Sequence, residues 1–200
     1  IQADSIAAVE AAQRMSSDTA SVAQVAAAPV SIYKDSLLEA AHSAEAQIVT
    51  LANDKFEVAF TTKGAQPYSV KINEYSSYGG GELFIFKPEM SRYDIQVYAG
   101  ETINTADFNF VVAEKTDTSL AMRLPFAGGG YIEQRYSIAE GSYSVKNYLS
   151  FVGMENVIPK NVFSFDVDYF VTMPRMEKGY KSEVQYSKLD YYFNGEKKPE

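Results

Sequence analysis

The sequence contains no cysteine, no tryptophan and a single histidine, His42. Without cysteine, thiolate zinc sites, disulfide scaffolds and cysteine nucleophiles are excluded. His42 lies in an alanine-rich N-terminal stretch, so the rest of the chain has no imidazole for a Ser-His-Asp triad or for a histidine-based metal or acid-base site. Catalysis there would depend on carboxylates, lysine and tyrosine, and no motif marks such a set. From the residues alone we therefore assign no catalytic, cofactor-binding or metal-binding residues.

Basic charge and long apolar runs are also scarce. Lys and Arg number 18 against 26 Asp and Glu, which gives a net charge of -8, and the basic residues are scattered along the chain. Because nucleic-acid binding depends on Lys and Arg that neutralise phosphates, we expect no nucleic-acid partner. No run approaches the roughly 20 apolar residues that a transmembrane helix needs. The sequence therefore contains no candidate membrane-spanning helix.

The composition changes abruptly near residue 47. Residues 1–46 are rich in Ala, Ser and Gln and hold Tyr33 as their one aromatic residue, whereas every Phe and every other Tyr follows. An alanine-rich segment buries too little apolar surface to offset the entropy lost on ordering. We therefore expect residues 1–46 to be a linker, partly helical or disordered, and residues 47–200 to be one domain. Within the linker we expect a helix at Asp4–Met15 and a flexible spacer at Ser16–Pro29. A second helix is expected at Ser36–Ala46.

From Ile48 onward, apolar residues recur at every second position, which is typical of half-buried strands. Asn53 and Asp54 mark a turn between the first two strands. The expected strands are Ile48–Leu51, Phe56–Phe60, Tyr68–Ile72, Leu83–Phe86, Asp94–Tyr98, Phe108–Ala113, Leu120–Leu124, Tyr131–Ile138, Ser144–Val152, Val162–Met173 and Lys188–Phe193. No helical pattern separates them, so parallel βαβ units are excluded. We expect an all-β fold in which two antiparallel sheets pack face to face as a β-sandwich.

Two glycine runs could suggest phosphate-binding loops. Gly79–Gly81 and Gly128–Gly130 are followed neither by the Gly-Lys-Ser/Thr of a P-loop nor by a helix. Both runs fall between expected strands. We therefore interpret them as hairpin turns.

Asp166 and Asp168 alternate with apolar residues of an expected strand, which places both carboxylates on one face. Their separation of about 7 Å approaches the spacing found in inverting glycosidases. Any half-exposed strand with two acidic residues has the same spacing, so a solvated face is the favoured interpretation. A glycoside hydrolase that uses these two residues is kept as a third class of function.

The stretch Pro174–Tyr180 places dense charge between a long strand and the last tyrosine-rich strand. Its candidate partner-contact residues are Arg175, Glu177, Lys178 and Tyr180, and the alternative is an ordinary solvated connection. The abundant Tyr and Phe side chains are interpreted mainly as core. A subset of them lining a groove for an apolar chain or peptide is the alternative.

Several strings resemble the large periplasmic domain of the YidC family of membrane-protein insertases, in the form found in Bacteroides-type bacteria. They are VTLANDKFEVAFTTKGAQPYSV, SRYDIQVYAG, ETINTADFNF, FVGMENVIP and PRMEKGYKSEVQYS, and they begin at Val49, Ser91, Glu101, Phe151 and Pro174. The resemblance covers nearly everything from Ile48 onward. One departure is Ala65, because the family often has a second glycine after Lys63 and Gly64.

The resemblance implies a non-enzymatic function. Such a protein helps nascent membrane proteins insert and fold in the bacterial inner membrane, alone or beside the Sec translocon, with this domain in the periplasm. Residues 1–46 would then be the linker after a transmembrane anchor that this sequence lacks, and membrane contact would be made by helices absent from it. The family's domain is a longer β-supersandwich, so residues 47–200 are expected to be its N-terminal part and the sandwich to be incomplete.

The alternative function is a carbohydrate-binding or mutarotase-like module, because sugar-processing proteins share supersandwich folds. Mutarotase chemistry relies on histidines that residues 47–200 lack, so only sugar binding would survive. Titration with mono- and oligosaccharides separates this alternative from the insertase. No cofactor is expected under either hypothesis.

Overall fold

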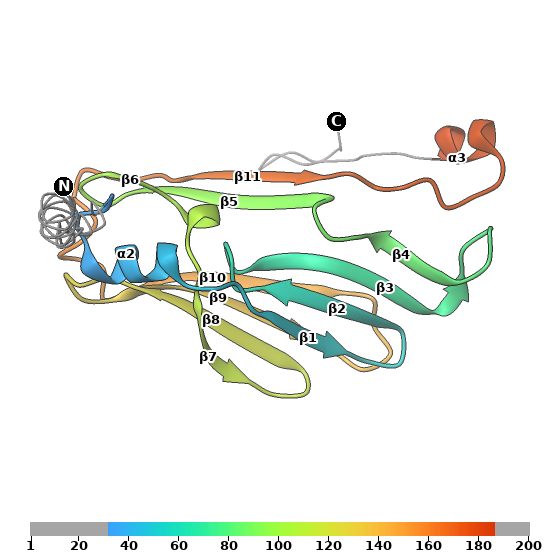
Figure 1. The fold of residues 1–200 in the computed structure, drawn as a ribbon, viewed down its shortest axis with the longest axis horizontal. Coiled ribbons are helices and arrows are strands. Elements are labelled where there is room, and N and C mark those ends of the chain that lie inside the picture. The colour runs from blue at the N-terminus through green and yellow to red at the C-terminus, as the bar shows by residue number, and fades with distance from the viewer. Residues whose placement is uncertain (1–31, 187–200) are drawn as a thin grey trace, which may run out of the picture. The chain divides into compact units, whose positions relative to one another are not determined.

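The computed structural model describes residues 32–186, and residues 1–31 and 187–200 lie outside the described part. The expected helix at Asp4–Met15, the spacer at Ser16–Pro29 and the strand at Lys188–Phe193 therefore fall outside it. A compact unit begins at Tyr33. Its strands are antiparallel throughout and form three sheets, so the all-β fold class is confirmed (Figure 1).

Helix α2, Ser36–Ser43, precedes the first strand and belongs to the packed unit. Asp35 caps it, because its carboxylate accepts hydrogen bonds from the backbone N–H groups of Leu37 and Leu38 at 2.8 and 3.3 Å. Leu38 and Ala41 are buried in the main core, and the helix contacts β8. The sequence predicted this helix within a linker, and the structure shows that the described residues from Tyr33 onward pack against the domain.

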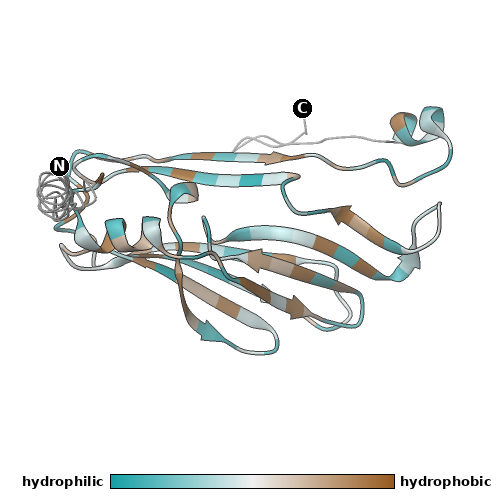
Figure 2. Ribbon diagram, viewed as in Figure 1, coloured by the Kyte–Doolittle hydropathy of each residue, from teal (hydrophilic) through white to brown (hydrophobic). Residues whose placement is uncertain are grey.

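Sheet 1 is a meander of four strands in the order β1-β2-β3-β4. Its strands are β1 Ile48–Ala52, β2 Phe56–Thr61, β3 Gln66–Ser76 and β4 Glu82–Phe86. The predicted turn at Asn53 is confirmed, because its side-chain oxygen accepts hydrogen bonds from the N–H groups of Lys55 and Phe56. Figure 2 shows that apolar residues predominate along β1 and β4 and are mixed with polar residues along β3.

Sheet 2 also has four strands, in the order β10-β9-β8-β7. Its strands are β7 Val111–Lys115, β8 Ser119–Pro125, β9 Tyr131–Ile138 and β10 Val145–Val152. The two glycine runs are hairpin connections as predicted, since Gly79–Gly81 lies between β3 and β4 and Gly128–Gly130 between β8 and β9. The expected strand at Phe108–Ala113 begins only at Val111.

Sheet 3 has three strands in the order β11-β5-β6 and was not predicted as a separate sheet. Its strands are β5 Ser91–Tyr98, β6 Thr102–Asn104 and β11 Asp166–Val171. Two short helices complete the described fold, the 3-10 helix η1 Thr105–Asp107 and α3 Tyr180–Tyr186. The sequence did not predict these two helices, because both are too short to show an apolar period of 3.6.

One buried core joins α2 and all three sheets. At its centre the rings of Phe60 and Tyr136, from sheets 1 and 2, lie 4.4 Å apart. Phe108 and Phe110 are buried in the irregular segment after η1, where Phe108 packs against Tyr33 at 4.8 Å. The histidine of the chain also has a packing role, because the His42 ring lies edge-on to Phe108 at 6.1 Å.

The turn between β1 and β2 is tied to the turn between β9 and β10. The Asn53 side-chain amide donates hydrogen bonds to the carbonyl oxygens of Ala139 and Ser142 at 2.7 and 2.8 Å. The N–H of Gly141 donates to the Asp54 carboxylate at 2.9 Å. Sheets 1 and 2 are therefore joined by hydrogen bonds between two loops as well as by the core.

The turn between β4 and β5 holds a non-glycine residue in the left-handed region. Glu89 has φ 67 in the turn that the hydrogen bond from Met90 N–H to the Lys87 carbonyl closes at 3.1 Å. Pro88 precedes it, and a Pro followed by a positive-φ residue is the type II turn that favours glycine at the second central position. The exposed Glu89 side chain brings no burial to offset this strain.

We expect Glu89→Gly to raise the free energy of unfolding by about 0.5–1 kcal/mol. Relief of roughly 1–2 kcal/mol of left-handed strain exceeds the extra entropy that glycine loses on folding. Urea denaturation measures the change. Glu89→Ala is the control, because it removes the same carboxylate but keeps the Cβ, and an equal gain from it would contradict the strain explanation.

Candidate functional site

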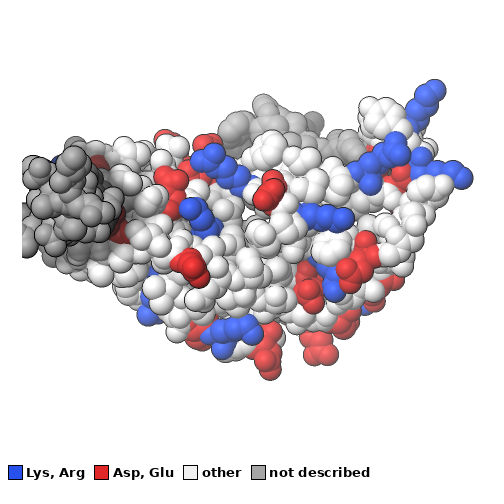
Figure 3. Space-filling view, in the orientation of Figure 1, with Lys and Arg blue, Asp and Glu red and all other residues white. Residues whose placement is uncertain are grey.

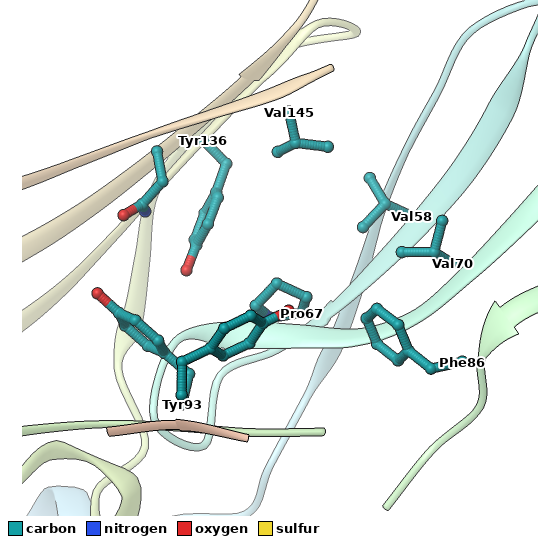
Figure 4. A pocket seen from close by; sticks show the side chains of 9 residues that line it. Val58, Pro67, Val70, Phe86, Tyr93, Tyr136 and Val145 are labelled. Carbon is teal, nitrogen blue, oxygen red and sulfur yellow. The ribbon is translucent and has the colours of Figure 1, made fainter. Parts of the chain in front are cut away.

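An apolar groove opens where the three sheets meet, and we call it the three-sheet groove (Figure 4). Its volume is about 390 Å³. The lining residues come from seven strands and are Val58, Pro67, Val70, Phe86, Tyr93, Tyr136, Val145, Asn147 and Tyr169. Eight of these nine side chains are aliphatic or aromatic, so the groove is suited to an apolar occupant.

Cross-strand pairing produces the apolar wall on sheet 1. Val58 lies directly opposite Val70, and Val70 lies opposite Phe86. Directly paired residues of antiparallel strands point to the same face of a sheet. The three side chains therefore form one row across β2, β3 and β4.

Sheets 2 and 3 contribute paired residues in the same way. Tyr136 of β9 lies opposite Asn147 of β10, and Val145 lies two positions before Asn147 on the same face. Tyr93 of β5 lies opposite Tyr169 of β11, and their rings meet edge to face at 6.0 Å. The groove is thus built from side chains that the strand registers align.

Two polar groups of the groove, the Tyr136 hydroxyl and the Asn147 amide, are hydrogen-bonded within the protein. The Tyr136 hydroxyl donates a 2.7 Å hydrogen bond to the Ala65 carbonyl, and burial raises the pKa of Tyr136 well above its ordinary value. The Asn147 amide donates to Gln134 at 2.8 Å, and the Gln134 Nε2 is buried without a hydrogen-bond partner. The lining carries no carboxylate, imidazole or amine. Its chemistry is that of apolar binding.

The turn that supports Tyr136 contains the residue that departs from the family pattern. Ala65 follows Gly64 with φ 48, in the left-handed region that glycine favours, and its methyl group is fully buried. Its N–H donates to the Thr62 carbonyl at 3.1 Å while its carbonyl accepts from Tyr136. Ala65 therefore adopts a left-handed turn conformation that glycine would adopt more easily. The hydrogen bonds of its N–H and carbonyl groups stabilise this conformation.

The acidic pair singled out from the sequence lies away from the groove. Asp166 and Asp168 share one face of β11, as predicted, and both are exposed. Tyr169 alternates with them and lines the groove, so the carboxylates point to the opposite face. The structure therefore favours the solvated-face interpretation of this pair.

The four candidate partner-contact residues are all exposed and do not line the groove. Arg175, Glu177 and Lys178 lie in the loop after β11, and Tyr180 is the first residue of α3. The Lys178 ammonium lies 5.5 Å from the centre of the Tyr78 ring, which is typical of a cation-π contact. Their role in partner contact stays a prediction.

The described part of the chain shows neither a patch of one charge sign on the visible face nor a metal-binding cluster. Figure 3 shows Lys and Arg interspersed with Asp and Glu over the visible face. Residues 32–186 contain no group of three or more His, Asp or Glu side chains placed to hold a metal ion. A helix long and apolar enough to cross a membrane is likewise absent from these residues.

Comparisons with known proteins find similar sequences among membrane protein insertases. No protein-family model and no solved structure matches it. A curated protein of Porphyromonas gingivalis, "Membrane protein insertase YidC", is 27% identical over 209 residues, which cover 98% of this chain and 33% of that protein. Proteins of the same name from Phocaeicola vulgatus and Azobacteroides pseudotrichonymphae are 27% and 25% identical, over 94% and 72% of this chain.

The chain spans about a third of the length of the first of these relatives. The match begins well before Ile48, because it includes almost all of the alanine-rich segment as well as the β fold. The resemblance predicted from the sequence is therefore confirmed: over nearly its whole length, this chain is similar to one part of the YidC membrane protein insertases.

Proposed function

We propose that this chain is the periplasmic β domain of a bacterial inner-membrane insertase. The whole protein helps integral membrane proteins insert and fold, alone or with the Sec translocon, and this domain acts without enzymatic chemistry. Similarity to named insertases over 98% of the chain supports the proposal. Contact with the membrane belongs to transmembrane helices of the parent protein, before and after this segment.

The observation that carries a specific role is the apolar lining of the three-sheet groove. A nascent membrane protein exposes large apolar side chains before it enters the bilayer. Burial of one such side chain contributes about 1.5–3 kcal/mol, which is offset in part by the entropy lost on association. Binding of one or two side chains is therefore weak and reversible, as a transient chaperone contact requires.

We expect Val145→Asp to weaken binding of an apolar peptide by tenfold or more. Val145 lines the groove and is 36% exposed, so the substitution leaves folding largely intact but forces a bound apolar chain to desolvate a carboxylate. A Leu/Val-rich peptide with flanking lysines and a fluorescent label is titrated and followed by anisotropy. Because the lysines are cationic, the titration is repeated at high salt to remove electrostatic attraction.

Val111→Asp is the matched control, since Val111 is 60% exposed on β7 and does not line the groove. The same two substitutions in the parent insertase test the function itself, by complementation of a depleted strain and by insertion of a reporter membrane protein. Loss of insertion with Val145→Asp but not with Val111→Asp supports the role of the groove. Full insertion after removal of the whole segment contradicts the proposed function.

The carbohydrate-binding alternative is less well supported by the groove. Sugar sites combine aromatic platforms with several free hydrogen-bonding side chains, whereas the amide of Asn147 is already bonded to Gln134 and the hydroxyl of Tyr136 to Ala65. Saturable millimolar or tighter binding in a titration with mono- and oligosaccharides would favour the sugar module. Unchanged properties after replacement of Asp166 and Asp168 by asparagine would remove the hydrolase interpretation.

The exposed loop after β11 is a second proposed contact. Arg175, Glu177, Lys178 and Tyr180 present charge and one aromatic ring to solvent, a combination common in protein interfaces. Its partner is proposed to be a component of the Sec translocon. Site-specific photocross-linking from these positions in the parent protein tests the contact.

A further inference from the structure

Strand β10 forms an open edge of sheet 2, and this edge borders the three-sheet groove. The order β10-β9-β8-β7 places β10 at the end of the sheet, where it pairs only with β9 among the described residues. All of β10 pairs in one register without a bulge, whereas β7 at the opposite edge has an irregularity after Val112. Because an unpaired strand edge offers free N–H and C=O groups to another extended chain, β10 is a candidate site for strand addition.

The hydrogen bonds of β9 show which backbone groups of β10 point outward. The N–H of Ile138 donates to the carbonyl of Thr118, directly before β8, at 2.9 Å. Ile138 therefore does not bond to Val145, which lies opposite it on β10. Hydrogen-bonded and non-hydrogen-bonded pairs alternate along an antiparallel ladder. The backbone groups of Val145, Asn147 and Leu149 therefore point away from β9.

Two of these residues also have side chains that line the groove. Val145 and Asn147 are exposed, although Tyr136, opposite Asn147, is buried. The C-terminal part of the edge is more covered, since the ring of Phe151 packs against that of Phe165 at 5.3 Å. A chain laid along the N-terminal half of β10 would direct alternate side chains into the groove, because directly paired residues share a face. Main-chain hydrogen bonding and apolar burial thus coincide there.

A lysine on the other face of β10 adds a charge preference. Lys146 alternates with the two groove-lining residues and is exposed. Arg123 and Arg135, on the same face of sheet 2, both pair with Glu133, whereas Lys146 has no ion-pair partner among residues 32–186. Opposite charges on neighbouring strands stabilise their pairing. An acidic residue at the outward position of an added strand would complement Lys146.

We propose that an extended peptide segment, in which apolar residues alternate with acidic or hydroxyl residues, adds as a strand to the outer edge of β10. Its apolar side chains enter the three-sheet groove beside Val145, and its acidic side chains lie on the face of Lys146. The inference rests on the proposed function, because it names the conformation and sequence pattern of the client that the groove accepts. A formed helix bonds its backbone groups internally, so the client is bound before it becomes helical.

Backbone N-methylation of a peptide tests the pairing in the full 200-residue chain. The probe is a short fluorescent peptide that alternates Val and Leu with Glu and Thr, and its binding is followed by anisotropy. Alternate residues of an extended chain direct their N–H groups to opposite sides, so only one set can bond to β10. We expect N-methylation of one set to weaken binding at least tenfold and of the other set less than twofold. Equal effects of the two methylated peptides would overturn strand addition.

A proline in the edge is the complementary change in the protein. Asn147→Pro removes an outward N–H, and proline is tolerated in an edge strand where that group faces solvent. Asn147→Ala is the matched control, because it loses the same side-chain bond to Gln134 but keeps the N–H. We expect the proline variant to bind the alternating peptide at least tenfold more weakly than the alanine variant, with similar circular dichroism spectra. Equal affinities of the two folded variants contradict the proposal.

The charge preference is tested with a second peptide in which Lys replaces Glu. The unsubstituted chain is expected to prefer the Glu peptide, and Lys146→Glu is expected to reverse the preference. The same preference in both proteins contradicts the proposed pattern of the client. Dimers in sedimentation that Asn147→Pro abolishes would show that a second copy occupies the edge, and would overturn the proposal.

Failure of this inference is distinguishable from failure of the proposed function. Binding of the Leu/Val-rich peptide that is lost with Val145→Asp but is indifferent to backbone methylation would overturn strand addition alone. The groove would then still bind apolar side chains, and the complementation experiment on the parent insertase would be unaffected.

Discussion

Replacement of Leu38 by alanine is expected to lower the free energy of unfolding by about 2–5 kcal/mol. Leu38 is 1% exposed, so the substitution leaves a cavity between α2 and the sheets in addition to the lost burial. Small domains have only about 5–15 kcal/mol of stability in total, so the loss is large. Chemical denaturation followed by circular dichroism measures it.

Leu37→Ala is a matched control on the same helix. Leu37 is 40% exposed, so its replacement is expected to cost well under 1 kcal/mol. Equal and small effects of the two substitutions would show that α2 is an appended linker, as its alanine-rich sequence suggests. A large difference would instead show that α2 is an integral element of the β domain. The N-terminal boundary of the domain would then lie near Tyr33 rather than near residue 47.

Gly130→Ala is the second substitution with a large expected effect, about 2–5 kcal/mol. A Cβ at this position would lie 2.3 Å from the carbonyl oxygen of Gly153 and 2.4 Å from that of Val152, so the backbone after β10 must move. Overpacking costs about 1–3 kcal/mol, and the φ of 77 adds about 1–2 kcal/mol of left-handed strain for a residue with a side chain. Thermal unfolding of the purified variant gives the loss.

Gly129→Ala separates these two contributions. Gly129 has φ 96 but no atom within 4 Å of the Cβ position, so only the backbone strain applies and the expected cost is about 1–2 kcal/mol. Equal losses at the two positions would contradict the steric explanation. The glycine run that resembled a phosphate loop is then explained by close packing of β9 against the end of β10.

Much of the fold was predictable because period-two alternation is a local signal. Of the strands expected up to Met173, all but the one at Phe108–Ala113 correspond closely in position to strands of the structure or contain them. Phe108 and Phe110 follow the strand period and are buried, but η1 precedes them and a single bridge from Asn109 replaces the ladder. Burial and strand pairing therefore do not always coincide.

The packing of α2 and the presence of α3 could not be derived from the sequence. In α2 only Leu38 and Ala41 are buried. Two buried residues are too few to distinguish a packed helix from an alanine-rich linker by composition. The capping carboxylate of Asp35 also accepts a hydrogen bond from Ala127, 92 residues away, which no local pattern reveals. Helix α3 has seven residues, too few to establish a helical period.

The groove illustrates the same limit at the level of the site. The sequence indicated that part of the aromatic excess could line a groove for an apolar chain, but it could not identify the residues. Val58, Val70 and Phe86 meet because their strands pair in one register, and a bulge between Val70 and Lys71 contributes to that register. Register and sheet-to-sheet packing are long-range properties that a single sequence does not display.

The hydrogen bonds of Asn53 to the β9–β10 turn have a consequence for biosynthesis. Their acceptors lie 86 and 89 residues further along the polypeptide, so the ribosome completes sheet 1 well before the partners of this turn exist. Sheet 1 ends at Phe86, so at typical translation rates the delay before Ala139 and Ser142 are made is roughly 3–11 s. During that interval the newborn segment exposes the apolar row that later faces the core, and export machinery or a holdase that shields it would determine the yield of folded protein.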